Sequence, residues 1–198
     1  MMGLHPSSVK DDYQTELQIV RNKLFGIESS NYIAVGEIGI DLYWDQTYQT
    51  QQVEVFSTQL GWAVEKKLPV AIHTRNAFDQ TIEVLSDYEG VIGVFHCFSG
   101  NIEQAIKVVD KGFLLGIGGV LTFKNSGLDK VVQAMDLSKL IIETDSPFLA
   151  PMPFRGKRNE SAYVTLVAQK IAILKSCSFE EVCTETTYNA TKLFNLAD

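Results

Sequence analysis

The chain has 198 residues and a mass of 22.1 kDa, which suits a single domain with a sizeable buried core. Its net charge of −7 excludes binding of nucleic acid by attraction of the whole protein, and 45% hydrophobic residues exclude a disordered chain. No apolar run approaches the roughly 18 to 20 residues of a membrane helix, and the N-terminus lacks a secretory h-region. Three scattered cysteines are typical of a reducing compartment, so we expect a cytoplasmic protein without a membrane segment.

Short continuous apolar runs, typical of parallel strands covered on both faces, alternate with apolar residues at helical spacing. In chain order we expect a strand over residues 32–40, a helix over 53–63, a strand over 68–72, a helix over 78–85 capped by Asn76, a strand over 91–95, a helix over 102–109 capped by Asn101, strands over 113–117 and 140–142, and a helix over 163–174. This repetition predicts an α/β domain with a parallel sheet, and by itself it leaves a barrel and an open sheet as alternatives.

Polar side chains stand at the ends of four of these strands. Glu37 lies in the second half of its strand, His73 and His96 directly follow theirs, and Asp145 follows the last. Because the carboxyl ends of parallel strands meet at one edge, we expect these side chains to converge. A single histidine there is more often a hydrogen-bonded structural residue, but two imidazoles with two carboxylates favour a divalent metal site.

Other polar and small residues near the strand ends have plainer interpretations. We expect Asp41 and Glu143 to orient or cap neighbouring groups rather than to bind metal. Cys97 is interpreted as a buried small hydrophobe, and the glycines from Gly116 to Gly119 could let substrate approach the backbone. These glycines do not form a complete dinucleotide fingerprint.

Seven motifs then occur in an order that resembles the TatD family of metal-dependent deoxyribonucleases, which are TIM barrels of the amidohydrolase type. They are GLHP (3–6), VGEIGIDLYWD (35–45), PVAIHTR (69–75), FHCFSG (95–100), IETDSPFLAP (142–151), RGKRNE (155–160) and TTYNATKLFNL (186–196). The resemblance covers essentially the whole chain, residues 1–198, as one hydrolase domain.

The resemblance implies a function and residue roles. One or two divalent cations, Mg²⁺, Mn²⁺ or Zn²⁺, would be bound by Glu37, His73, His96 and Asp145, and Asp145 would also be the catalytic residue that handles the attacking water. The implied substrate is the end of a DNA strand, cleaved at its phosphodiester bonds. Implied substrate contacts come from Arg75, Arg155, Arg158 and His5.

One departure from the family pattern affects these expectations. Relatives begin with a strand that carries His-x-His, and this chain has no such motif. We therefore expect a barrel incomplete at its N-terminus, without the first two strands and most of the third. Such a chain should have reduced or no nuclease activity, and self-association could cover its unpaired strand edge.

Two alternatives remain open from the residues. The chain could be an amidohydrolase-type enzyme that cleaves another small ester or amide. It could also be a catalytically dead module that binds nucleic acid, because a fold alone does not determine function.

Overall fold

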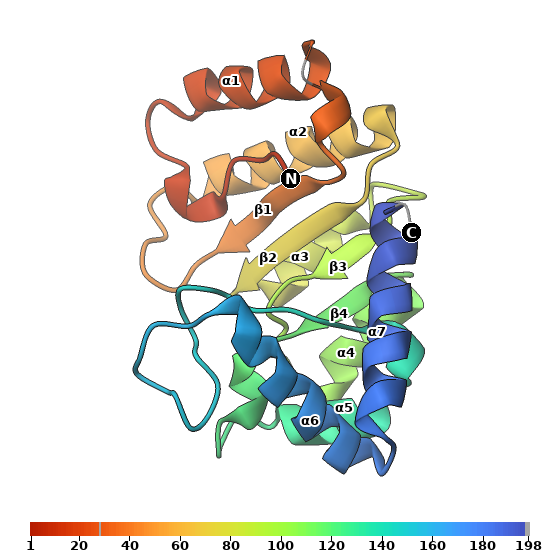
Figure 1. The fold of residues 1–198 in the computed structure, drawn as a ribbon. Helices are drawn as coiled ribbons and strands as arrows, with labels where there is room; N and C mark the ends of the chain where they lie inside the picture. The colour runs from red at the N-terminus through yellow and green to blue at the C-terminus, as the bar shows by residue number, and fades with distance from the viewer. Residues whose placement is uncertain (28, 197–198) are drawn as a thin grey trace. The chain divides into compact units, whose positions relative to one another are not determined.

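The computed structural model describes residues 1–27 and 29–196, which form two compact units, Met1–His96 and Cys97–Asp198. Strands and helices alternate along the chain in both units, and the strands that pair within each unit are parallel (Figure 1). The predicted α/β fold with parallel strands is therefore confirmed. Within the described residues, no helix is both long and apolar enough to span a membrane.

The first unit is built on three parallel strands, with β2 between β1 and β3. The strands are β1 (Val35–Asp41), β2 (Val70–Arg75) and β3 (Gly93–Phe95), and the helices are α1 (Tyr13–Phe25), α2 (Gln49–Lys66) and α3 (Phe78–Leu85). Helix α2 packs against β1, and its Phe56 and Leu60 are fully buried, as are Ile38 and Ile40 of the strand. Each such side chain contributes about 1.5–3 kcal/mol by leaving water.

The second unit pairs two further parallel strands and covers them with helices. It contains α4 (Ile102–Asp110), β4 (Leu114–Ile117), α5 (Leu128–Ala134), β5 (Leu140–Ile142), α6 (Val164–Lys175) and α7 (Phe179–Phe194). Helices α6 and α7 lie side by side (Figure 1). The buried Asn189 of α7 donates to the carbonyl oxygens of Leu137 and Leu140, both at 2.9 Å, and so fixes α7 to the start of β5.

The two expected helix caps differ in outcome. The Asn101 side chain accepts the Gln104 backbone N–H at 2.9 Å, and the Gln104 side chain accepts the Asn101 backbone N–H at 3.0 Å. Together the two hydrogen bonds form a capping box. The prediction for Asn76 is wrong, because Ala77 is the N-cap of α3 and Asn76 has a left-handed backbone with φ of 53°. Asparagine tolerates that conformation, so Asn76 serves the turn after β2 instead. Helices α1, α5 and α7 lie outside the elements expected from the sequence.

The register of β1 against β2 is irregular at one position. Gly36 is opposite Ala71 and Ile38 is opposite Ile72, so Glu37 has no partner across the pair. Such a bulge turns a side chain away from the regular alternation, and Glu37 is the half-exposed residue of an otherwise buried strand. Beyond the bulge, Gly39 lies opposite His73.

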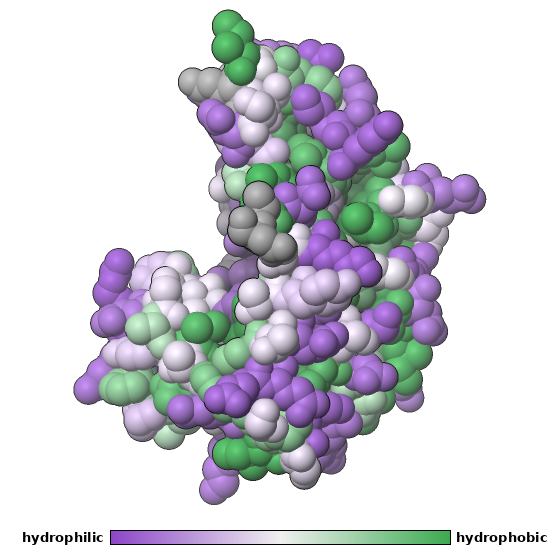
Figure 2. Space-filling view, turned by 45° about the vertical axis from the view of Figure 1, so that its right-hand side comes forward, coloured by the Kyte–Doolittle hydropathy of each residue, from purple (hydrophilic) through white to green (hydrophobic). Residues whose placement is uncertain are grey.

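Exposed polar and apolar side chains are interspersed on the face drawn in Figure 2. Apolar side chains at the surface are normal for a globular protein when they are scattered singly.

Candidate metal centre

The Glu37 carboxylate lies between two histidines in the first unit. Its Oε2 is 3.7 Å from Nε2 of His5, and its Oε1 is 3.7 Å from Nε2 of His96. These separations are too long for hydrogen bonds. Two ligands that share a cation at about 2.0–2.2 Å from each lie roughly 3–4 Å apart. The spacing of Glu37 from both imidazoles is therefore that of ligands around an ion.

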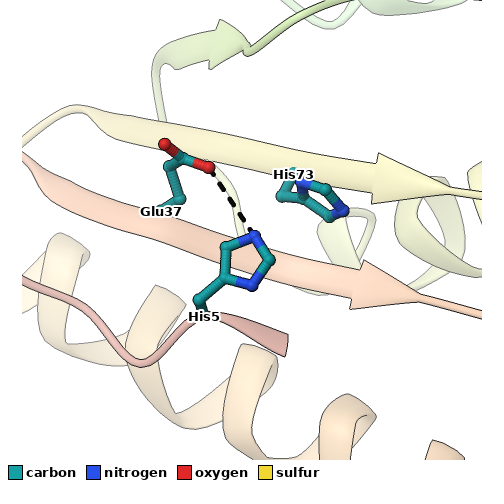
Figure 3. A group of neighbouring side chains, drawn as sticks. All are labelled: His5, Glu37 and His73. Atoms are coloured by element: carbon teal, nitrogen blue, oxygen red, sulfur yellow. Dashed lines mark ion pairs between the residues drawn. The ribbon is translucent and has the colours of Figure 1, made fainter. Parts of the chain in front are cut away.

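His5, Glu37 and His73 form a group of possible metal ligands. Each offers one ligand atom, and these atoms all lie within 4.8 Å of one another. The three side chains come from the segment before η1 (Pro6–Ser8), from β1 and from β2 (Figure 3). The His5 and His73 rings meet edge to face, with centroids 4.5 Å apart. Two imidazoles and a carboxylate form a donor set that suits Zn²⁺ or Mn²⁺.

Two hydrogen bonds between Gln59 of α2 and the Leu4 backbone position His5. The buried Gln59 accepts the Leu4 N–H at 2.6 Å and donates to the Leu4 carbonyl at 3.1 Å, which fixes the residue before His5. His5 Nδ1 lies 2.8 Å from Ser7 Oγ and accepts the Ser7 backbone N–H at 3.2 Å. These contacts turn Nε2 of His5 toward Glu37. Hydrogen bonds to the other ring nitrogen commonly orient metal-binding histidines in this way.

Asp41 holds His73 from the end of β1. Its Oδ2 lies 2.9 Å from Nε2 of His73, and its Oδ1 accepts the Tyr43 N–H at 3.0 Å. The buried Gln52 of α2 fixes the Asp41 backbone through bonds of 2.8 and 3.1 Å. The expectation that Asp41 orients a neighbouring group agrees with this geometry.

The pKa of each histidine of the group lies below its ordinary value. Burial lowers the pKa of His5, and the neighbouring His73 lowers it further, against the opposing charges of Glu37 and Asp41. Burial also lowers the pKa of His73, although the hydrogen bond to Asp41 acts in the other direction. Because a metal binds the unprotonated imidazole, the lowered pKa values mean that protons compete less with a cation for these rings.

The other two predicted ligands, His96 and Asp145, are not part of this group of three. His96 follows β3, and its side chain is 14% exposed, facing Oε1 of Glu37. Asp145 belongs to the second unit, where it is half-buried and its carbonyl accepts the Phe148 N–H at 2.6 Å. The buried Asn159 ties this turn by donating to the Phe148 carbonyl at 2.7 Å. The roles of Asp145 as ligand and catalytic residue stay predictions.

Of the four predicted substrate contacts, His5 lies in the candidate metal group and the other three are exposed arginines. Arg75, at the end of β2, lies over the Tyr43 ring with its guanidinium carbon 3.6 Å from the ring centroid. Arg155 lies 4.5 Å from the centroid of Phe123, and Arg158 is exposed. Their binding of substrate stays a prediction.

Two interpretations of the second unit need correction. Gly116 accommodates the Glu143 side chain rather than a substrate, because a Cβ on Gly116 would lie 2.5 Å from Oε2 of Glu143. The other oxygen of Glu143 accepts the Cys97 N–H. Cys97 is half-buried with φ of 46°, since β3 ends at Phe95 and does not continue through it.

Sequence reasoning missed His5 as a candidate ligand and missed both glutamines that support the site. The signal for His5 is its place in Gly-Leu-His-Pro. There a buried leucine precedes the histidine and a proline follows it, so both neighbours restrict its backbone. Gln52 and Gln59 stand among the apolar positions of α2, and their burial could have been expected from that helical stripe.

Comparisons with known proteins give a consistent set of relatives. A family model described as TatD related DNase matches residues 1–195. The uncharacterized metal-dependent hydrolase YabD of Bacillus subtilis is 41% identical over 198 residues, which are 98% of this chain and 76% of that protein. The uncharacterized metal-dependent hydrolase YcfH of Escherichia coli is 36% identical over 197 residues, which are 98% of this chain and 72% of that protein.

Solved structures show the same relationship. The TatD homolog YJJV of Escherichia coli superimposes with a TM-score of 0.87 at 29% identity, covering 99% of this chain and 76% of that one. A hydrolase TatD family protein of Entamoeba histolytica superimposes with a TM-score of 0.80 at 21% identity, covering 98% of this chain and 73% of that one, which shows the fold alone. The chain thus spans about three quarters of these relatives' lengths.

Proposed function

The chain belongs to the TatD-related family of metal-dependent hydrolases, and from this membership and its site we propose that it hydrolyses phosphodiester bonds at the ends of DNA strands. The observation that carries the proposal is the group of His5, Glu37 and His73, whose ligand atoms lie within 4.8 Å of one another. Neutral imidazoles and a carboxylate at this spacing fit a divalent cation.

A divalent cation bound there supplies Lewis acidity toward a phosphoryl oxygen and lowers the pKa of water. The chain's own groups hold and orient what reacts. Glu37 offers one oxygen to each of two imidazoles, while Asp41 fixes the ring of His73. In this proposal Asp145 would accept the proton of the attacking water.

Local cations must bind the substrate, because the whole chain carries a net charge of −7. Arg75 stands two residues beyond His73 on the same strand, so both side chains point to the same side of β2. Its guanidinium suits a phosphate oxygen next to the bond that is cleaved, and Arg155 and Arg158 would contact phosphates further along the strand.

The test uses the purified chain, stripped with a chelator and reloaded separately with Mn²⁺, Mg²⁺ and Zn²⁺. End-labelled single-stranded and double-stranded DNA, a lactone and an amide are offered to each form. We expect slow stepwise shortening of DNA, at the reduced activity expected from the sequence, that requires metal and falls at least about tenfold in Glu37→Gln, which keeps the shape of the side chain but removes its charge. The control is Glu54→Gln, which changes a carboxylate of α2 that pairs with Tyr13.

Each other outcome has a definite meaning. Cleavage of the lactone or amide without cleavage of DNA would contradict the proposal and favour another hydrolase of the wider amidohydrolase type. DNA binding without turnover in every metal form would favour a binding module.

A further inference from the structure

Two aromatic side chains and an arginine form an exposed cluster beside the metal centre. Trp44 is 82% exposed and Tyr43 is 47% exposed, and their rings meet edge to face with centroids 4.6 Å apart. The guanidinium carbon of Arg75 lies 3.6 Å from the Tyr43 centroid and 5.9 Å from that of Trp44. Arg75 thus covers one face of the tyrosine, while most of the indole is left in water.

The cluster is fixed to the same carboxylate that holds His73. Oδ1 of Asp41 accepts the Tyr43 N–H at 3.0 Å, and Oδ2 of Asp41 lies 2.9 Å from Nε2 of His73. Arg75 and His73 lie on one side of β2, and Arg75 is opposite Asp41 in the register. Asp41 therefore connects the backbone of Tyr43 to a histidine of the metal centre.

Trp44 also forms part of the wall of a cavity. This cavity has a volume of about 120 Å³, and Lys10, Asp41 and Tyr48 line it as well. Lys10 pairs at 3.3 Å with Asp45, which also lines the cavity, and lies 5.2 Å from the Tyr48 centroid. The open indole, the Arg75 guanidinium and the nearby metal site match the two parts of a nucleotide, a flat π-system and an anionic phosphate.

We propose that Trp44 is the stacking surface for a nucleobase of single-stranded DNA next to the phosphodiester that is cleaved, with Arg75 contacting a phosphate of that strand. This inference rests on the proposed function and adds the part of the substrate that the site recognises. Aromatic stacking accepts any base, so the subsite selects unpaired bases at a strand end rather than a sequence. A base inside a duplex has both faces covered by its stacked neighbours and offers none to the indole.

The test compares two probes of equal length and charge, a thymidine hexanucleotide and the same deoxyribose-phosphate backbone without bases. Binding to chelated protein, where no turnover competes, is measured by anisotropy of an end label. We expect the thymidine probe to bind about tenfold more tightly than the abasic probe. Trp44→Ala should remove this difference, whereas Trp44→Phe should retain most of it.

A second measurement does not depend on the alanine variant remaining folded. The chain has two tryptophans, and the second, Trp62, packs against Phe25. In a Trp62→Phe background, the thymidine probe should quench the fluorescence of Trp44 and the abasic probe should not. Equal binding of the two probes, or quenching by neither, would overturn the inference.

Nuclease assays keep this inference separate from the proposed function. Metal-dependent cleavage of DNA with no difference between the two probes would leave the proposed function standing and overturn the stacking role of Trp44. Base-dependent binding and quenching in a chain that cleaves no DNA would support the stacking role and contradict the proposed reaction.

Discussion

Oδ2 of Asp41 lies 2.9 Å from Nε2 of His73, and both side chains are mostly buried. A carboxylate in this position fixes the orientation of an imidazole and raises its basicity, which strengthens its bond to a metal. The pair therefore links the end of β1 to the metal centre without Asp41 itself needing to be a ligand.

Asp41→Asn should weaken metal binding by about 10- to 100-fold, because the amide keeps the shape of the side chain but loses its charge. Titration calorimetry of Zn²⁺ or Mn²⁺ into chelated protein measures the change. Asp45→Asn is the matched control, since Asp45 pairs with Lys10 in an exposed salt bridge. Equal affinities of the two variants would contradict an orienting role for Asp41.

His5→Gln should also lower metal affinity by at least about tenfold, because it removes an imidazole whose ligand atom lies within 4.8 Å of those of Glu37 and His73. The same titration measures it, and circular dichroism checks that the variant is folded. Ser7→Ala, which removes the hydroxyl beside Nδ1 of His5, should have a smaller effect. A full loss in Glu37→Gln with no loss in His5→Gln would exclude His5 as a ligand.

Gly39→Ala should destabilise the fold by about 1–3 kcal/mol or more, as a side chain forced into a glycine conformation does. Gly39 has φ of 145°, and a Cβ there would collide with the backbone carbonyl of His73. Urea unfolding of the metal-free protein measures the change. Gly61→Ala in α2 is the control with the opposite sign, because a Cβ on Gly61 meets nothing within 4 Å. It should stabilise the helix by about 0.5–1 kcal/mol.

The metal-free protein should lose stability as the pH falls below the ordinary histidine pKa of 6.5. Burial lowers the pKa of His5 and of His73 in the folded chain, so below pH 6.5 the unfolded chain binds more protons and is favoured. Above pH 6.5 both states are neutral at these positions and the slope disappears.

Urea unfolding between pH 5.5 and 7.5 tests this dependence. The charges that face the two rings come from Glu37 and Asp41, which oppose the shift, and from His96 and Arg75, which add to it. His5→Gln should reduce the slope of stability against pH whatever its effect on stability at pH 7.5. A slope of the opposite sign would mean that these histidines are charged in the folded protein.

The sequence by itself determined the alternation of strands and helices, and it predicted Glu37 and His73, two of the three residues in the candidate metal group. The last strand was expected over 140–142 and lies at Leu140–Ile142. A short apolar run followed by charged residues indicates a buried strand that ends at the surface. The Asn101 cap was predictable because its bond to Gln104 is local. Asn76 was not, because the turn after β2, rather than the cap preference of asparagine, sets its backbone.

The tertiary structure alone decided how the candidate ligands face one another. Contacts between residues distant in sequence build the site. They are the irregular pairing of β1 with β2 at Glu37, the contact between Asp41 and His73, and the hydrogen bond from Gln59 to Leu4. Hydrophobic periodicity reports which side of an element is buried, but it carries no information on which polar atoms meet across strands. His5 became a candidate ligand only when packing of its segment against α2 brought its ring to Glu37.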